Sequence, residues 1–286
     1  MSIVTESSIR NVKAAVADGY RQVAPGWHKW RQEFKIAGTA TTQAILNASD
    51  VKPGMRVLDV ACGAGEPALT LLPLVGQTGY VVAIDLVGEM LASAVALLPT
   101  ARANIMFNVA DGEALPFRDE TFDLVTCRAA VMHFPDPLQA LKEAYRVLQP
   151  GGRAVFSALG PARDSPAIMT TIAIILRHIP SLPDPALGLD VYRFGVPGTL
   201  STMFAAASFR EVHEEILSVP CPWPGDAAHF WQALPDHGWR VNELIESLPS
   251  DHYQRVTTEV VAALRSHERD GVLQLTAPIV IASGKR

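Results

Sequence analysis

The sequence predicts an α/β fold in which a doubly wound, mostly parallel sheet of seven strands carries helical cap insertions. Short and almost continuously apolar segments alternate with helix-forming segments between residues 56 and 159. That alternation is typical of a parallel sheet covered by helices on both faces. It stops after residue 160, and further helix-forming sequence stands both before and after the alternating region. These additions predict the cap.

Five strands are expected in the alternating region, which begins after a turn at "KPG" (residues 52–54). The apolar segments that predict these strands are "RVLDVA" at 56–61 and the residues 79–86, 104–111, 122–128 and 152–159. The segments between them that suit helices are residues 66–75, 88–98 and 137–148.

The flanking regions lack this alternation. Residues 7–48 have the apolar spacing of helices, with Gly19, Pro25 and Gly38 as expected breaks. After residue 160 the expected elements are a helical region at 161–190, a helix at 198–207, a strand at 211–219 and an aromatic-containing insertion at about 220–270. The closing segment "LQLTAPIVIASGKR" alternates enough to predict an edge strand.

Three units follow from this reading. They are a helical lid (1–48), a ligand-binding core (49–160), and a remainder (161–286) that completes the sheet and carries cap insertions at about 161–197 and 220–270. Such additions can close over the carboxyl edge of the sheet, where open α/β sheets bind their ligands. They can equally serve only to cover apolar surface.

Composition limits the partners and the setting. A net charge of −5 argues against nucleic acid as the main partner, because affinity for phosphates needs clustered Lys and Arg. The three scattered cysteines show no metal-ligand spacing and favour a reduced, cytoplasmic protein. The N-terminus lacks the apolar core of a signal peptide, and residues 167–179 are too short to span a bilayer, so no stable membrane insertion is expected. Monomer and homodimer both stay open.

The segment "RVLDVACGAGEPALTL" (56–71) is a glycine-rich turn from a strand into a helix. It fits the loose dinucleotide fingerprint, and Asp85 lies at the right distance to bind a ribose. Two features disfavour a pyrophosphate: Pro67 removes a donor from the first turn of the helix, and Asp59 adds an anion at the end of the strand. A sulfonium cofactor without phosphate suits such a pocket better.

At this point the chain resembles the class I S-adenosylmethionine-dependent methyltransferases, in particular the group that includes the enzymes of ubiquinone and menaquinone biosynthesis (methyltransferase type 11). The resemblance covers about residues 50–160 and depends on ordered blocks: "VLDVACGAG", with Ala61 in place of the first glycine, "VVAIDLVGEML", "VADGEALPFRDETFDLVTCRAAVMHFPDP" and "EAYRVLQPGGRAVF". It implies a Rossmann-like fold and S-adenosylmethionine as cofactor, with S-adenosylhomocysteine as its product.

The resemblance also implies a role for each matching residue. Asp59, Gly63 and Gly65 would hold the methionine end and the ribose, and Asp85 would accept the ribose hydroxyls. The adenine would lie between Leu86 and Met90. Its amino group would meet Asp111, with Gly112 and Glu113 beside it. The main chain at Arg128 would hold the ammonium group, while its side chain points elsewhere. No metal site is expected.

The acceptor side is less defined by the sequence. Methyl transfer is an in-line displacement that needs a positioned nucleophile and exclusion of water. His133 is the best-placed candidate for a general base, although a role in packing is also open. The residues that could contact the acceptor are Tyr20, Trp27, His178, Tyr192 and Trp231. Aromatic residues of a helical cap can also belong to its core.

The predicted function is methyl transfer to oxygen or an activated carbon of a small apolar or aromatic metabolite, such as a quinone precursor or a natural product, with nitrogen still open. One alternative is a catalyst of cyclisation or rearrangement that retains the cofactor without methylating. Another is a nicotinamide-dependent oxidoreductase, which only the glycine loop favours. Formation of S-adenosylhomocysteine would separate the first alternative from methyl transfer.

Overall fold

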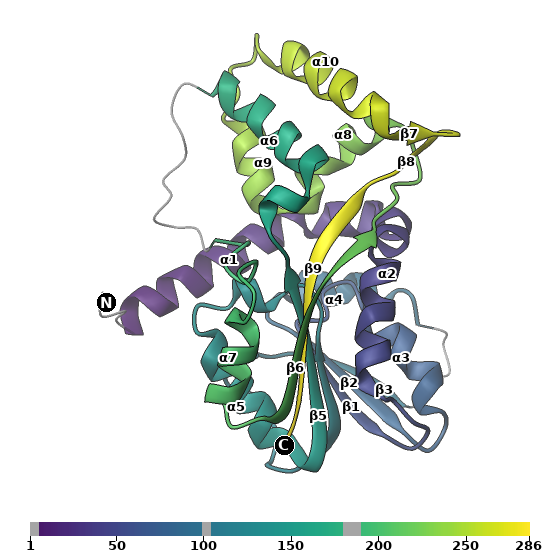
Figure 1. Ribbon diagram of the computed structural model, residues 1–286, viewed down its shortest axis with the longest axis vertical. Coiled ribbons are helices and arrows are strands. Elements are labelled where there is room, and N and C mark those ends of the chain that lie inside the picture. The colour runs from purple at the N-terminus through teal and green to yellow at the C-terminus, as the bar shows by residue number, and fades with distance from the viewer. Residues whose placement is uncertain (1–5, 99–103, 180–189) are drawn as a thin grey trace.

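The computed structural model describes residues 6–98, 104–179 and 190–286. Its main sheet has seven strands in the order β3-β2-β1-β4-β5-β9-β6 (Figure 1). Their bounds are β1 (Arg56–Val60), β2 (Tyr80–Asp85), β3 (Ile105–Val109), β4 (Phe122–Cys127), β5 (Leu148–Leu159), β6 (Arg210–Pro220) and β9 (Thr276–Lys285). The first five strands are parallel, and β9 is antiparallel to both neighbours. The predicted fold class is confirmed.

Helices cover both faces of the sheet. One face carries α2 (Arg31–Ser49), α3 (Ala68–Val75) and α4 (Gly88–Val95), and the other carries α5 (Pro137–Val147) and α7 (Thr199–Ala206). Adjacent strand residues point to opposite faces. On β1, Val57 therefore packs in the cluster of Leu71, whereas Leu58 packs in the cluster of Leu141.

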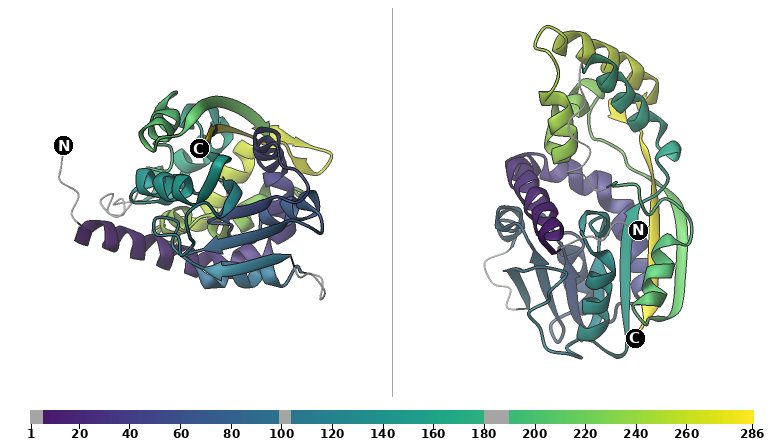
Figure 2. Two further views of the ribbon diagram at one scale, coloured as in Figure 1. Left: turned by 90° about the horizontal axis from the view of Figure 1, so that it is seen from below. Right: turned by 90° about the vertical axis from the view of Figure 1, so that its left-hand side faces the viewer.

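The cap is a separate cluster of elements beyond the carboxyl edge of the sheet (Figures 1 and 2). It consists of α6 (Pro166–His178), α8 (Ala227–His237), α9 (Trp239–Glu246), α10 (Tyr253–Leu264) and the hairpin of β7 (Glu268–Arg269) and β8 (Val272–Leu273). Between cap and sheet lies α1 (Glu6–Lys29). Trp30 and Phe34, at the junction of α1 and α2, are buried in the core of the cap.

The breaks predicted in the first region are wrong. Helix α1 continues through Gly19 and Pro25, α2 continues through Gly38, and the helices separate at Trp30. The two glycines allow close packing: an added Cβ would lie 2.5 Å from the ring of Trp239 at Gly19, and 2.3 Å from the Arg128 guanidinium at Gly38.

Pro25 is tolerated for a different reason. Its missing N–H leaves the carbonyl of Arg21 without the usual donor within the helix. Pro25 and Arg21 are both exposed, so water can supply a hydrogen bond there. A proline on the solvent side of α1 therefore does not end the helix.

The predicted edge position of the C-terminal strand is also wrong. β9 lies between β5 and β6, and β6 forms the edge. β9 is buried along most of its length, including Ser283, whose hydroxyl accepts a hydrogen bond from Arg153. The small polar residues that give β9 its alternation can be buried because both of its edges are paired with neighbouring strands.

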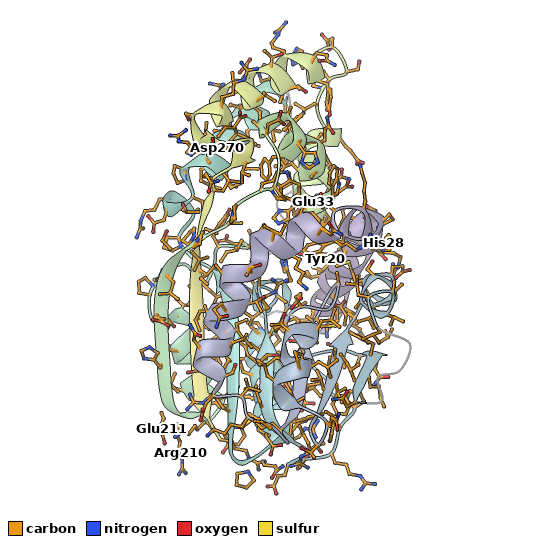
Figure 3. The ribbon with its side chains drawn as sticks, turned by 90° about the vertical axis from the view of Figure 1, so that its right-hand side faces the viewer. Tyr20, His28, Glu33, Arg210, Glu211 and Asp270 are labelled. Atoms are coloured by element: carbon orange, nitrogen blue, oxygen red, sulfur yellow. The ribbon has the colours of Figure 1, made fainter. Side chains whose placement is uncertain are left out.

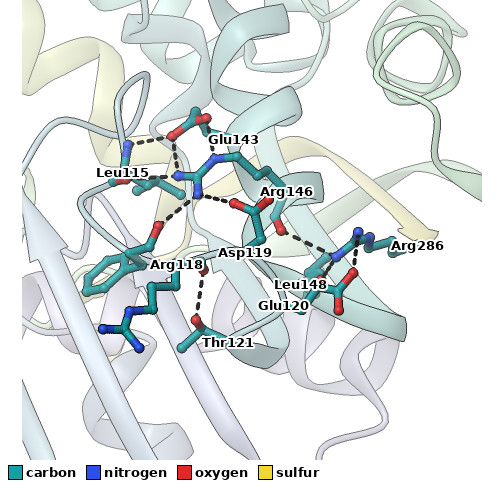
Figure 4. Close-up of polar contacts among 10 residues, drawn as sticks. Leu115, Arg118, Asp119, Glu120, Thr121, Glu143, Arg146, Leu148 and Arg286 are labelled. Atoms are coloured by element: carbon teal, nitrogen blue, oxygen red, sulfur yellow. Dashed lines mark hydrogen bonds and ion pairs between the residues drawn. The ribbon is translucent and has the colours of Figure 1, made fainter.

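An arginine network fixes the long loop between β3 and β4 (Figure 4). Arg146 of α5 donates to both carboxylate oxygens of Glu143, at 2.7 and 2.8 Å, and to the carbonyls of Leu115 and Phe117. Glu143 in turn accepts the N–H of Leu115. The carboxylates of Glu143 and Asp119, which accept hydrogen bonds from Arg146, raise the pKa of Arg146 above its usual value. This loop carries residues 111–113, so α5 positions part of the site.

Replacing Gly19 with alanine should destabilise the protein by about 1–3 kcal/mol, because the new Cβ would overlap the buried ring of Trp239. An alanine at an unrestricted helix position would instead be stabilising relative to glycine. Urea unfolding measures the change, with Gln22→Ala on the exposed side of α1 as the control. A Gly19→Ala protein as stable as wild type would contradict the close packing of α1 on α9.

Candidate functional site

A cavity of about 160 Å³ opens at the carboxyl ends of β1, β2 and β4, beneath α1. The sequence-predicted residues that line it are Tyr20, Trp27, Gly63, Asp85, Leu86, Met90, Asp111, Gly112, Arg128 and His133. They come from α1, the glycine loop after β1, and the segments that follow β2, β3 and β4. The strand order divides between β1 and β4, and this is where open α/β sheets place their ligands.

Asp85 organises the floor of the cavity. Its Oδ2 accepts the N–H of Gly63 at 2.8 Å, and its Oδ1 accepts the N–H of Val87 at 2.9 Å. The carboxylate thereby joins the glycine loop to the turn that begins α4. Gly63 has a φ of +54°, a backbone conformation that favours glycine. Burial raises the pKa of Asp85 above its usual value.

Asp59 lies beneath the cavity and is not part of its wall. Its carboxylate is fully buried and accepts the hydroxyl of Thr126 at 2.7 Å and the N–H of Ala68 at 3.1 Å. Burial raises the pKa of Asp59 to about 7. Asp59, which was predicted to lie beside the ligand, instead holds β1, β4 and α3 together.

Gly65 and Glu113 also stand behind the cavity wall. Gly65 has a φ of +105°, and an added Cβ would lie 2.8 Å from the side chain of Leu69. Glu113 is buried, accepts the N–H of Asp136 at 2.6 Å, and pairs with Lys13 of α1. Both residues support the loops that line the cavity.

Lys13 joins α1 to the cavity wall, and no sequence pattern predicted this contact. Its ammonium donates to Asp111 at 2.5 Å and also pairs with Glu113. A lysine on an amphipathic helix ordinarily lies on the solvated face. The two acidic partners are about a hundred residues away in the chain, so only the folded structure reveals the contact.

Tyr20 and His133 meet across the cavity. Tyr20 lies on the side of α1 that faces the sheet (Figure 3), and a hydrogen bond of 2.9 Å joins its hydroxyl to Nε2 of His133. Desolvation, together with the charge of Arg193, lowers the pKa of His133 to about 4. Burial raises the pKa of Tyr20 well above its usual value. Both rings are therefore neutral near pH 7.

Arg193 is a second residue that the sequence reading did not single out. Its Nη2 donates to the carbonyls of Val131 and Phe134, at 3.2 and 2.5 Å. His133 is the last residue of the short helix η1 (Val131–His133), and the two carbonyls belong to the first residue of this helix and to the residue that follows it. Arg193 therefore holds the turn that presents His133, and it does so from the segment that precedes α7.

Three residues that were predicted to contact the acceptor do not line the cavity. Trp231 is buried in the cap, where its Nε1 donates to Thr257 at 2.9 Å. His178 lies against Glu259, with Nε2 and Oε1 3.2 Å apart. Tyr192 is half-buried in the segment before Arg193. Trp231 and His178 have partners within the cap.

The described residues contain no cluster of three or more His, Cys, Asp and Glu side chains able to hold a metal ion. In the same part of the chain, no helix combines the length and the apolar character needed to cross a membrane.

Comparison with known proteins identifies the family. A model described as a methyltransferase domain matches residues 58–156. Nocamycin O-methyltransferase from Saccharothrix syringae is 31% identical over 262 residues, which cover 84% of this chain and 89% of the relative. The chain belongs to the class I S-adenosylmethionine-dependent methyltransferases. Its cofactor is S-adenosylmethionine.

Other relatives of this methyltransferase match a shorter region. Demethylmenaquinone methyltransferase from Lactococcus lactis is 42% identical over 103 residues, which cover 36% of this chain and 41% of the relative. The match therefore spans less than half of that relative. Among solved structures, the YcgJ protein from Bacillus subtilis superposes with a TM-score of 0.55 at 19% identity, covering 86% of this chain and 97% of the other. That similarity shows a shared fold.

The cavity of the methyltransferase fits this cofactor. Its wall carries the carboxylates of Glu66, Asp85 and Asp111, which suit a ligand with sulfonium and ammonium charges and hydroxyl groups. The wall also includes the apolar side chains of Leu86 and Met90, which suit the faces of a purine.

The buried Asp59 should make stability depend on pH. Its folded-state pKa of about 7 lies above the ordinary 3.8, so the folded state binds the proton more tightly and stability falls as pH rises from about 4 to 7. The slope from one such group is at most about 1.4 kcal/mol per pH unit. Urea unfolding of wild type and Asp59→Asn at several pH values should show that the free energy of unfolding of the wild type falls relative to that of the variant over this range. A difference that is constant with pH would contradict the assignment.

Proposed function

We propose that this methyltransferase transfers the methyl group to an oxygen atom of a small, predominantly apolar or aromatic metabolite. The observation that carries the proposal is the extent of the match to nocamycin O-methyltransferase, which covers 84% of this chain. The matches to demethylmenaquinone methyltransferases cover 36–45% of the chain. The longer match therefore extends beyond residues 58–156, the region matched by the methyltransferase-domain family. Transfer to an activated carbon is the second possibility.

On the cofactor side, the proposed roles follow the cavity wall. Asp85 accepts the ribose hydroxyls, Leu86 and Met90 contact the adenine, and Asp111 with Gly112 meets the adenine amino group. Asp111 accepts hydrogen bonds from Lys13 and from the N–H of Glu113. A carboxylate has about four lone-pair sites, so it can still accept one from a ligand.

On the acceptor side, the proposed contacts are Tyr20 and Trp27 of α1, with His133 and Phe134 opposite. These side chains give the cavity a mostly apolar wall with one hydrogen-bonded pair. When bound, S-adenosylmethionine supplies a methyl group on a positively charged sulfur. The tasks left to the protein are to hold the acceptor oxygen in line with that methyl group and to exclude water.

The pKa of His133 supports a proposal about the kind of oxygen that is methylated. A base is most effective when its pKa is near the working pH, and the pKa of His133 is lowered to about 4. Such an imidazole is a weak base, and it already shares a hydrogen bond with Tyr20. An acceptor that ionises readily, such as a phenol, an enol or a carboxylic acid, needs little help. We therefore favour an acidic oxygen over an alcohol.

The proposal is tested by incubating the enzyme with S-adenosylmethionine and a panel of apolar phenols, enols and carboxylic acids, with matched aliphatic alcohols and amines as controls. We expect O-methylated product and S-adenosylhomocysteine in equal amounts from an acidic acceptor. Preferential methylation of the amines or alcohols would contradict the acceptor class. Conversion of a substrate without S-adenosylhomocysteine would support the rival in which the cofactor is retained.

The titration of His133 gives a second test. With a pKa of about 4, the imidazole is already unprotonated above about pH 5, so kcat/KM should show no loss between pH 7.5 and 5.5 that is due to this group. The profiles of wild type and His133→Gln should therefore run parallel over this range. A wild-type decline centred near pH 6.5 that vanishes in His133→Gln would show that the histidine acts as an ordinary general base.

A further inference from the structure

The turn between β4 and α5 (residues 128–136) carries part of the cavity wall, and few hydrogen bonds within it hold its shape. Its members that line the cavity are Arg128, Ala129, Ala130, His133, Phe134 and Pro135. In its middle, η1 is a single helical turn, in which the N–H of His133 donates to Ala130 at 2.8 Å and the N–H of Phe134 donates to Val131 at 3.3 Å. Hydrogen bonds in such a short 3₁₀ segment have poor geometry. The position of η1 therefore depends on contacts from other elements.

Both ends of this turn are attached to buried residues. At its start, the N–H of Ala129 donates to the hydroxyl and the carbonyl of Ser157, at 2.9 and 3.1 Å, and Ser157 is fully buried in β5. At its end, the N–H of Asp136 donates to the buried carboxylate of Glu113 at 2.6 Å. Glu113 belongs to the loop of Asp111, which is proposed to meet the adenine. The end of the turn is thereby tied to the cofactor side of the cavity.

Arg193 holds the middle of the turn. Its Nη2 donates to the carbonyl of Val131 at 3.2 Å and to the carbonyl of Phe134 at 2.5 Å. His133 lies between these two residues in the chain. The last carbonyls of a helix have no donor within it, so the two bonds complete the hydrogen bonding of η1. They also fix the backbone from which the side chains of His133 and Phe134 project.

The segment that supplies Arg193 is itself attached to the end of β5. The N–H of Gly195 donates to the carbonyl of Tyr192 at 2.7 Å, which closes a turn around Arg193. An added Cβ at Gly195 would lie 2.9 Å from the Cα of Pro161, two residues after β5. Phe194 is fully buried, and the Arg193 guanidinium lies 5.3 Å from the centre of its ring. Arg193 therefore reaches η1 from a fixed base.

We propose that Arg193 is a positioning residue for methyl transfer, which fixes the side chains of His133 and Phe134 against the acceptor without contacting the acceptor itself. Arg193 does not line the cavity, and it acts through two main-chain carbonyls. The inference rests on the proposed function, in which these two side chains contact the acceptor. Because the ends of the turn have attachments of their own, loss of Arg193 displaces the acceptor side of the cavity and leaves the cofactor side in place.

The experiment compares Arg193→Met and Arg193→Lys with a matched control, Arg286→Met. Arg286 also donates to two main-chain carbonyls, those of Arg146 and Leu148, but at the opposite end of β5 from the cavity. Urea unfolding establishes that each variant is folded. Binding of S-adenosylhomocysteine, measured by isothermal titration calorimetry, should change less than about twofold in all three variants.

The kinetic readout uses the apolar phenols, enols and carboxylic acids of the acceptor panel. For the acceptor, kcat/KM should fall about 10–100-fold in Arg193→Met, as expected when the reacting groups are misplaced by about 1 Å. Arg286→Met should keep the wild-type value. Arg193→Lys retains a charged donor on a different side chain, and it should recover part of the loss.

A third readout needs no acceptor. A hydrogen bond joins Nε2 of His133 to the hydroxyl of Tyr20, and the nitrogen-15 chemical shift of Nε2 reports this bond. The signal is assigned by its absence in His133→Gln. In Arg193→Met it should move toward its value in Tyr20→Phe, where the bond cannot form. In Arg286→Met it should stay at the wild-type value.

A loss of S-adenosylhomocysteine binding in Arg193→Met as large as the loss in kcat/KM would show that Arg193 supports the whole cavity, and would overturn the proposal. So would wild-type kinetics and a wild-type His133 signal in the folded variant. If Arg193→Met does not fold, Arg193→Lys should show a smaller loss with the same selectivity. If the wild type methylates no acidic acceptor, the proposed function fails, while calorimetry and the His133 signal still decide whether Arg193 positions this turn.

Discussion

The buried carboxylate of Asp59 is the interaction on which the site depends. It stands at the end of β1 and accepts hydrogen bonds from Thr126 of β4 and from the N–H of Ala68, the first residue of α3. The first N–H groups of a helix have no partner within the helix, so this contact satisfies one of them. The glycine loop between β1 and α3 is thereby closed at its base and open toward the cavity.

The loop is then held from its other side by Asp85, which accepts the N–H of Gly63. Two carboxylates therefore hold the loop: Asp59 of β1 binds the residue at its end, and Asp85 of β2 binds Gly63 within it. Only Asp85 faces the cavity. Asp59, which begins the glycine motif, thus stabilises the fold of the loop. Asp85 on β2 combines that task with a place in the cavity wall, where its carboxylate can meet a ligand.

The polar groups around the cavity differ in whether they have ion-pair or hydrogen-bond partners within the protein. At one end, Asp111 and Glu113 are paired with Lys13 of α1. At the other end, Trp27 Nε1 and Glu66 Oε1 have no hydrogen-bond partner, although Lys35 lies 3.4 Å from that oxygen, and Arg128 donates only to the neutral groups of Gly38 and Thr42. Buried polar groups in proteins are nearly always hydrogen-bonded. The satisfied end therefore keeps α1 in place over the cavity, while the unsatisfied end has the polar character of a binding site.

The sequence predicted the parallel core well because its information is local. Apolar segments such as "RVLDVA" and the glycine turn after it indicate their own conformation, and the order of the blocks identifies the edge of the sheet where Asp85 and Asp111 line one cavity. The place of β9 in the sheet depends instead on pairing with β5, more than a hundred residues earlier. Residue alternation within β9 carries no information about such a partner.

The helical regions were harder to predict for the same reason. Gly19 and Gly38 disfavour a helix by intrinsic propensity, yet α1 packs closely on the ring of Trp239 at Gly19 and α2 approaches the Arg128 guanidinium at Gly38. Likewise, Trp231 has the composition of a ligand contact, but its partner Thr257 lies on another helix of the cap. Whether an aromatic residue belongs to a core or a pocket depends on neighbours that the local sequence does not name.

The described cap elements act on the cavity through α1. None of the described residues of α6, α8, α9 or α10 lines the cavity, whereas α1 contributes Lys13, Tyr20 and Trp27 to it. The cap fixes the position of α1 by close packing at Gly19 and Gly26 and by the hydrogen bond of 2.7 Å from Trp30 Nε1 to Asp236. A change in the cap would therefore shift the acceptor wall as a unit. If the acceptor contacts α1, as proposed, a relative that matches most of the chain is more informative about the acceptor than one that matches the core alone.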